Sequence, residues 1–179
     1  WLAFVANGAL QRVSLAGGAP LRICDVSGVV SGGTWGADDT IVYALRGTGL
    51  FRVNATKGTP EPIPESGLAS WPEFLPDGER VLYTTQGPVG GLTAFAVIFA
   101  DGSSKRIVAA LAGGEGGTSA EGVLGTGTGG ALGQATIAGS YLVYGQSTGF
   151  VRALPVGPAS LRAAGPPVPL ADSAEPGAN

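Results

Sequence analysis

Residues 10–23 read LQRVSLAGGAPLRI and residues 50–63 read LFRVNATKGTPEPI. Six positions carry the same residue at a spacing of 40. They are Leu10, Arg12, Val13, Gly18, Pro20 and Ile23 in the first segment, and Leu50, Arg52, Val53, Gly58, Pro60 and Ile63 in the second. Each segment has the pattern of a strand, a glycine-containing turn and a second strand, so each predicts a β-hairpin.

A second recurring unit precedes these hairpins. WGADDTIVY at residues 35–43 matches FLPDGERVLY at 74–83, and WLAF at 1–4 and YLVY at 141–144 match its last strand. Asp-Gly predicts a tight turn, because glycine tolerates a positive φ and aspartate bonds its own backbone. The aromatic residues Phe4, Tyr43, Tyr83 and Tyr144 then occupy one equivalent position.

The two units together form a four-stranded repeat of about 40 residues, the length of one β-propeller blade. The fold prediction is therefore all-β, a partial propeller of four-stranded antiparallel blades. The predicted blades cover about 1–24, 33–63, 69–108 and 135–170. A Gly-rich insertion is expected at 111–134, and a disordered tail at 171–179.

Composition and charge exclude several classes of protein. With 44% hydrophobic and 13% charged residues, the chain is not a charge-driven disordered protein. The formal net charge is −3 and the ten Lys and Arg residues are scattered, so no nucleic-acid partner is expected. The longest apolar stretch, 92–100, is too short for a transmembrane segment.

The residue types present in the chain predict neither catalysis nor metal binding. There is no histidine, and Cys24 is the only cysteine, so His-based catalysis and thiolate metal sites are excluded. The G-x-S-x-G pattern at 145–149 is interpreted as a hairpin turn, and G-x-G-x-x-G at 125–130 as a chance match in the Gly-rich segment. We therefore expect no catalytic residues, cofactor or metal.

Five residues are candidates for partner binding. Arg12, Arg52 and Arg152 are predicted to share one blade position, either as a solvated face or as a row that grips carboxylates. Trp35 and Trp71, 36 residues apart, are predicted at the start of inner strands. There they either pack between blades or line the central channel as a recognition platform.

The turn Pro76-Asp77-Gly78 followed by Val81-Leu82-Tyr83 resembles the blade signature of TolB-like, WD-repeat-like six-bladed propellers of bacteria. The chain is more similar still to the C-terminal propellers of bacterial membrane-anchored Ser/Thr protein kinases. In those, segments like LQRVSLAGGAP, GLFRVNATKGTPEPI, WPEFLPDGERVLYTT and YLVYGQSTGFVRALPV recur in this order. The resemblance implies about four of six blades, in a fragment of a longer chain, with an extracytoplasmic location.

The expected function is a non-enzymatic propeller module that binds a protein, a peptide or a small ligand. By resemblance it is the extracytoplasmic sensor region of a Ser/Thr kinase or a TolB-like periplasmic scaffold. The alternative is a propeller fragment of an enzyme, such as a prolyl-oligopeptidase-type peptidase or a propeller hydrolase or lyase. The first and last blades are expected to leave apolar faces uncovered, so that the chain associates with other chains.

Overall fold

The computed structural model describes residues 1–86, 93–103, 106–111, 123–124, 132–146, 149–157 and 160–171. Every regular element in these ranges is a strand. In chain order the strands are β1 (Leu2–Ala6), β2 (Ala9–Val13), β3 (Leu21–Asp25), β4 (Val30–Trp35), β5 (Thr40–Leu45), β6 (Gly49–Asn54), β7 (Glu61–Pro62), β8 (Ser70–Phe74), β9 (Arg80–Gln86), β10 (Thr93–Phe99), β11 (Arg106–Leu111), β12 (Val123–Leu124), β13 (Leu132–Ala138), β14 (Tyr141–Gln146), β15 (Val151–Pro155) and β16 (Val168–Ala171). Within the described ranges, nothing forms a helix that could cross a membrane.

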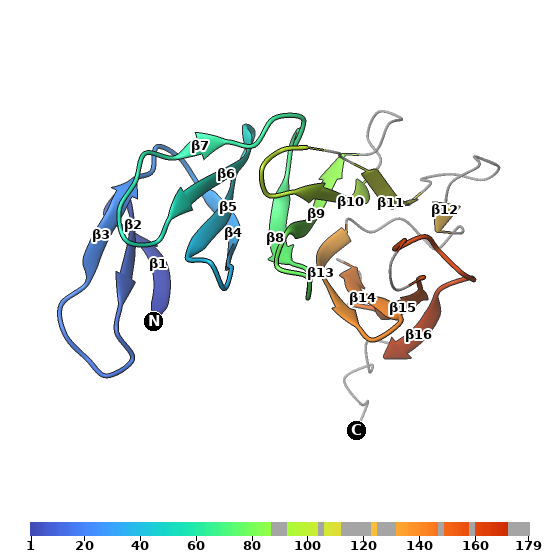
Figure 1. Cartoon of the computed structure of the whole chain (residues 1–179). Helices are drawn as coiled ribbons and strands as arrows, with labels where there is room; N and C mark the ends of the chain where they lie inside the picture. The colour runs from blue at the N-terminus through green and yellow to red at the C-terminus, as the bar shows by residue number, and fades with distance from the viewer. Residues whose placement is uncertain are drawn as a thin grey trace, which may run out of the picture.

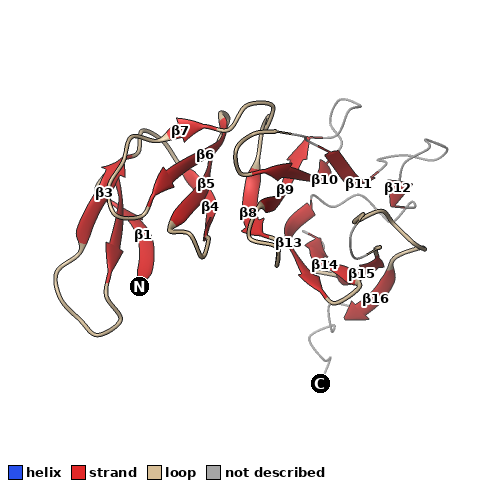
Figure 2. Ribbon diagram, viewed as in Figure 1, coloured by secondary structure: helices blue, strands red, loops and turns tan. Residues whose placement is uncertain are grey.

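The strands form four sheets that follow one another along the chain (Figures 1 and 2). We call them the first sheet (β1-β2-β3), the second (β4-β5-β6-β7), the third (β8-β9-β10-β11-β12) and the fourth (β13-β14-β15-β16). Neighbouring strands are antiparallel, except that β12 runs parallel to β11. This confirms the predicted all-β fold of propeller blades.

Two details differ from the predicted boundaries. β4 begins at Val30, ahead of the predicted start at 33. β12 lies within 111–134, the segment predicted as a Gly-rich insertion, and it extends the edge of the third sheet. The Gly-rich motif at 125–130, Ser147 and the residues after Ala171 lie outside the described residues.

Each sheet packs face to face on the next, and the core consists of three clusters between successive sheets. Strand β5 shows how alternation builds them. Ile41 and Tyr43 pack toward the first sheet, while Val42 and Ala44 pack toward the third. Because successive side chains of a strand point to opposite faces, one run of apolar residues serves two interfaces. Both faces of an internal sheet are therefore buried.

The four equivalent aromatic residues lie in the second strand of the repeat, as predicted. Tyr43, Tyr83 and Tyr144 are buried, each against the preceding sheet. Phe4 holds the same place in β1 but is half-buried, because among the described residues no sheet precedes the first. Burial raises the pKa of Tyr43 to about 12 and also raises the pKa values of Tyr83 and Tyr144.

Tyr83 separates the contribution of the ring from that of the hydroxyl. We expect Tyr83→Ala to lower the free energy of unfolding by about 3–5 kcal/mol, because it leaves a cavity between the second and third sheets. Tyr83→Phe is expected to keep or raise stability, since the Tyr83 hydroxyl is buried with no hydrogen-bond partner among the described residues. Urea unfolding of both variants measures the difference. Equal losses in the two variants would contradict this account.

The buried tyrosines also predict alkaline unfolding. Unfolded tyrosines ionise near pH 10, whereas burial holds the folded pKa values higher, so the folded state binds more protons above that pH. Their contribution to stability is present below about pH 10 and is lost as the pH rises toward 12. Melting temperatures measured from pH 8 to 12 should fall steeply in this window. Tyr43→Phe should make the fall shallower.

Candidate functional site

A groove with a volume of about 950 Å³ lies between the second and third sheets. It opens where the turns between β4 and β5, β8 and β9, and β10 and β11 come together with the connection from β6 to β7. Its lining residues are Asp38, Thr40, Arg52, Val53, Asn54, Gly58, Thr59, Glu61, Gly78, Glu79, Phe99, Ala100, Asp101 and Ser103. Residues from two repeats therefore form one concave surface.

Aspartate-capped turns build the rim of this groove. The Asp38 carboxylate accepts hydrogen bonds from the Thr40 amide at 3.0 Å and from the Thr40 hydroxyl at 2.8 Å. Asp101 accepts from the Ser103 amide at 2.8 Å. The hydrogen bonds from Thr40 lower the pKa of Asp38, and hydrogen bonds from the side chain and amide of Ser103, together with the nearby Arg52 charge, lower the pKa of Asp101. Both side chains are therefore anionic at neutral pH.

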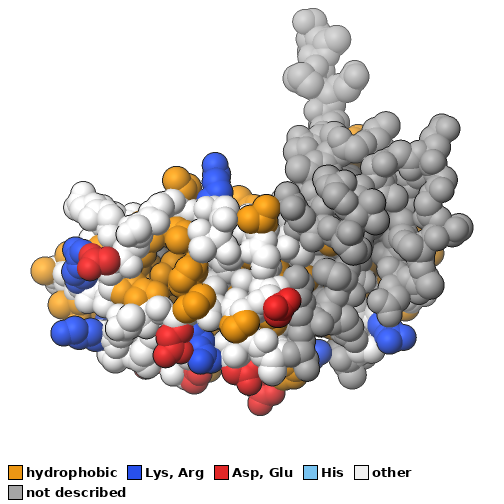
Figure 3. All heavy atoms as spheres, turned by 90° about the horizontal axis from the view of Figure 1, so that it is seen from above, with side chains coloured by type: hydrophobic (Ala, Val, Ile, Leu, Met, Phe, Trp, Pro, Cys, Tyr) orange, Lys and Arg blue, Asp and Glu red, His pale blue; other side chains and the backbone are white. Residues whose placement is uncertain are grey.

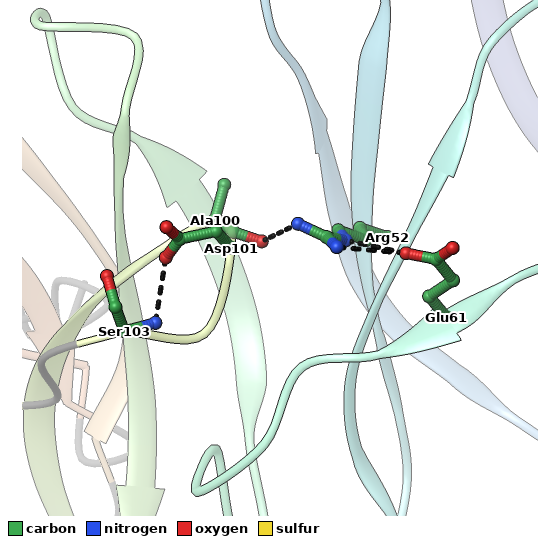
Figure 4. Close-up of polar contacts among 5 residues, drawn as sticks. All are labelled: Arg52, Glu61, Ala100, Asp101 and Ser103. Carbon is green, nitrogen blue, oxygen red and sulfur yellow. Dashed lines mark hydrogen bonds and ion pairs between the residues drawn. The ribbon is translucent and has the colours of Figure 1, made fainter.

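Arg52 on β6 lies at the junction of the two sheets (Figure 4). Its Nε donates to Glu61 Oε2 at 3.0 Å, its Nη2 lies 2.9 Å from the same oxygen, and its Nη1 donates to the Ala100 carbonyl at 3.4 Å. A solvent-exposed ion pair contributes little stability by itself. Its effect here is positional, since it holds the β10–β11 turn, with Asp101, against the outer strand of the neighbouring sheet.

The groove lining has an excess of negative charge. Four carboxylates, those of Asp38, Glu61, Glu79 and Asp101, face one guanidinium, that of Arg52, which leaves a net of three negative charges. Figure 3 shows the molecule from above, where charged side chains of both signs are interspersed among hydrophobic and uncharged ones. The groove is thus a concave and locally acidic surface.

The prediction that the three arginines share one blade position is wrong for Arg152. Arg12 pairs with Ala3 and Arg52 with Val42, which are equivalent positions in the repeat, but Arg152 pairs with Tyr144. The sequence match is therefore one residue out of register in the fourth sheet. A shift of one residue moves a side chain to the opposite face of its sheet. Arg52 consequently reaches the following sheet, whereas Arg152 lies on the face toward the preceding one.

The other two arginines contact aromatic rings. The Arg12 guanidinium carbon lies 4.5 Å from the centroid of the Trp1 ring, and that of Arg152 lies 5.8 Å from the centroid of the Phe150 ring. Both distances fall within the range of cation–π interactions. Of the three predicted arginines, the structure places only Arg52 in the groove lining.

The two tryptophans are not equivalent, which corrects the prediction that both begin inner strands. Trp35 ends β4, packs between the first and second sheets and donates from Nε1 to Asp39 Oδ1 at 3.2 Å. Trp71 follows the first residue of β8, has a φ of 55° and is 43% exposed. Its backbone lies against Gly32, where an added Cβ would be 3.0 Å from Trp71 Cα.

The inner strands are joined by side-chain hydrogen bonds. The Ser31 hydroxyl donates to that of Ser70 at 3.3 Å, and the Thr136 hydroxyl donates to Glu73 Oε1 at 2.5 Å. Trp71 therefore lies exposed on β8, an inner strand that hydrogen bonds connect to β4 on one side and to β13 on the other. In the described part of the chain, no group of three or more acidic or cysteine side chains is arranged to hold a metal ion.

Comparison with known proteins shows the fold alone. No protein-family model matches the sequence, and no curated protein matches it. The structure is similar to a chain of a nidogen/laminin complex, a β-propeller, with a TM-score of 0.53 and 14% identity, over 82% of this chain and 67% of that one. It also matches the tricorn protease, with a TM-score of 0.49 and 13% identity, over 85% of this chain and 16% of that one.

Two Asp-Gly turns at the groove provide a matched pair of substitutions. Gly78 and Gly102 both have positive φ, of 73° and 88°, but a Cβ at Gly78 meets nothing within 4 Å, while one at Gly102 lies 2.6 Å from Pro64 Cδ. Gly78→Ala should cost about 1–2 kcal/mol of stability from backbone strain alone. Gly102→Ala should cost roughly 1–3 kcal/mol more, because the sheets must move apart. Urea unfolding compares them, and equal losses would refute the close approach.

Proposed function

We propose that this chain is a non-enzymatic binding module that holds a segment of a protein or peptide in the groove between the second and third sheets. The observation that carries the proposal is the groove itself, about 950 Å³ in volume and lined by residues of two adjacent repeats. Loops that a rigid scaffold brings together from separate repeats are a common location of binding sites.

The groove's charge favours a cationic segment. Its carboxylates on Asp38 and Asp101 ionise readily, because hydrogen bonds lower the pKa of both. Arg52 already donates hydrogen bonds to Glu61 and to the Ala100 carbonyl, so fewer of its N–H groups can bind an anion on a partner. Complementary charge raises association rates and specificity at such surfaces. Lysine or arginine side chains on an extended partner fit this arrangement.

The cellular role that we propose rests on the resemblance to bacterial propeller families. We propose an extracytoplasmic role, as the sensor region of a bacterial membrane-anchored Ser/Thr kinase or, second, as a TolB-like periplasmic scaffold. The solved structure that the chain resembles, the nidogen/laminin complex, is itself an assembly of two proteins, which supports a role in protein binding. A kinase domain and a membrane helix encoded upstream in the gene would support the sensor, and an upstream region lacking both would contradict it.

The binding proposal is tested with two labelled ten-residue peptides, one alternating Lys and Thr and the other Glu and Thr. Fluorescence anisotropy should show binding of the cationic peptide only, and this binding should weaken as salt screens the charges. Asp101→Asn should weaken it by about twofold to fivefold, as expected for one exposed charge pair. Asparagine can still cap the turn, so the change removes charge while keeping the local backbone.

Asp25→Asn is the matched control. Asp25 is exposed, pairs with Arg22 and lies outside the groove lining, so its loss should leave peptide binding unchanged. Equal binding of both peptides would contradict the proposal. So would equal weakening by Asp25→Asn and Asp101→Asn, because the attraction would then belong to the whole protein rather than to the groove.

A further inference from the structure

The three inner strands β4, β8 and β13 share a β-bulge at the same position of the repeat. At this position the inner strand advances three residues while its partner strand advances two. The pairs that enclose the bulge are Val30–Leu45 and Gly33–Tyr43 in the second sheet, Ser70–Thr84 and Glu73–Leu82 in the third, and Leu132–Gln146 and Ala135–Tyr144 in the fourth. A bulge redirects a side chain out of the regular alternation of its strand. The equivalent residues within the three bulges are Gly32, Trp71 and Gln134.

Trp71 has a backbone conformation that a bulky residue rarely adopts. Its φ is 55°, in the left-handed region, and the proline that follows restricts its backbone further. Glycine fits the left-handed region without strain, and Gly32, with a φ of 105°, occupies the equivalent place in β4. Strain of this kind is concentrated at sites that hold a ligand. The local backbone favours glycine over tryptophan, which indicates a role of the indole other than stability.

The indole of Trp71 lies against Gly32 and leaves much of its own surface open. A Cβ at Gly32 would be 3.1 Å from Trp71 Cε3, so glycine at this position makes room for the ring. Trp71 is 43% exposed although a sheet lies on each side of its own, so its exposure is not that of an end sheet. Among the described residues none accepts a hydrogen bond from Trp71 Nε1, whereas Trp35 Nε1 donates to Asp39.

The surface around Trp71 is nearly free of charge. Strands β4, β8 and β13 contain a single charged residue, Glu73, and its carboxylate already accepts a hydrogen bond from the next inner strand. Val29 and Leu68, at equivalent positions before β4 and β8, are exposed, and Gln134 is exposed at the bulge of β13. The site therefore offers apolar contact together with hydrogen-bond donors of the indole and the amide, and it lacks the charge that would attract an ion.

A proline-rich segment has the complementary chemistry. Its rings are apolar and pack on aromatic side chains, and its polyproline II backbone leaves the carbonyl groups without internal partners. Because proline has no N–H, such a segment supplies acceptors only, and the Trp71 indole is a donor only. A saccharide fits less well, since each of its hydroxyl groups also brings a donor that the indole cannot accept.

We propose that Trp71 and Gln134 form a docking site for a proline-rich segment of a protein partner. A proline ring packs on the indole, and Trp71 Nε1 and the Gln134 amide donate hydrogen bonds to carbonyl groups of the segment. Neither residue belongs to the lining of the acidic groove. The site is therefore separate from the one proposed for a cationic segment, and either proposal can fail without the other.

The test uses the full chain and a blocked peptide of ten prolines, which is uncharged and does not fluoresce. Titration with this peptide should change the tryptophan emission of the protein to saturation, because a proline ring on the indole removes Trp71 from water. A blocked ten-residue peptide of alternating Gly and Ser should give no saturable change. Isothermal titration calorimetry supplies the dissociation constants of variants that lack the fluorescent residue.

Trp71→Gly should weaken peptide binding at least about tenfold, as for a tryptophan at the centre of an interface. It should leave the melting temperature nearly unchanged, because glycine suits a φ of 55° and the relief of strain offsets the lost ring contact. Trp1→Gly is the matched control, since Trp1 is 56% exposed on the first sheet, and it should bind the peptide normally.

Gln134→Glu tests the second donor. The substitution keeps the shape of the side chain but replaces the amide donors with acceptors, so it should weaken peptide binding by about threefold to tenfold, as expected for one hydrogen bond.

Four results would overturn the proposal. The first is an emission that does not change up to the solubility limit of the peptide, and the second is equal binding by Trp71→Gly and Trp1→Gly. The third is a loss of stability in Trp71→Gly as large as that in Tyr83→Ala, since the ring would then serve packing. The fourth is binding of maltohexaose that Gln134→Glu strengthens, since a saccharide would then be the occupant.

Discussion

The face-to-face packing of each sheet on its neighbours is the constraint on which the rest of the structure depends. Tyr43, Tyr83 and Tyr144 each pack on the preceding sheet, while Val42 and Leu82, one residue before Tyr43 and Tyr83, pack on the following one. A single four-stranded sheet cannot bury both of its apolar faces. Each sheet is therefore stable only as part of a series, and cooperativity passes along the chain from one interface to the next.

The candidate groove follows from this stacking. The groove forms where the outer strand of the second sheet meets a turn of the third, and Arg52 joins them through Glu61 and Ala100. The groove therefore depends on the contact between the two sheets.

Local sequence signals predicted the strands and turns well. The spacing of 40 residues located equivalent strands, and Asp77-Gly78 and Asp101-Gly102 marked turns whose hydrogen bonds the structure shows. The sequence predicted the register of strand pairing less well. Arg152 matched Arg52 in sequence, yet it pairs with Tyr144 and faces the other way, and Trp35 ends an inner strand that it was predicted to begin. A sequence match cannot resolve an offset of one residue, although that offset decides which face a side chain occupies.

The sequence by itself determined the all-β repeat, the position of its aromatic strand and the lack of histidine-based chemistry, because these depend on local turn propensity, alternation and residue inventory. Tertiary structure decided the groove. Arg52 and Ala100 are 48 residues apart, and only the stacking of two sheets brings the guanidinium within hydrogen-bond distance of that carbonyl. Such a contact depends on how two repeats are oriented relative to each other, and that orientation is fixed by the buried residues of the whole interface rather than by any local stretch of sequence.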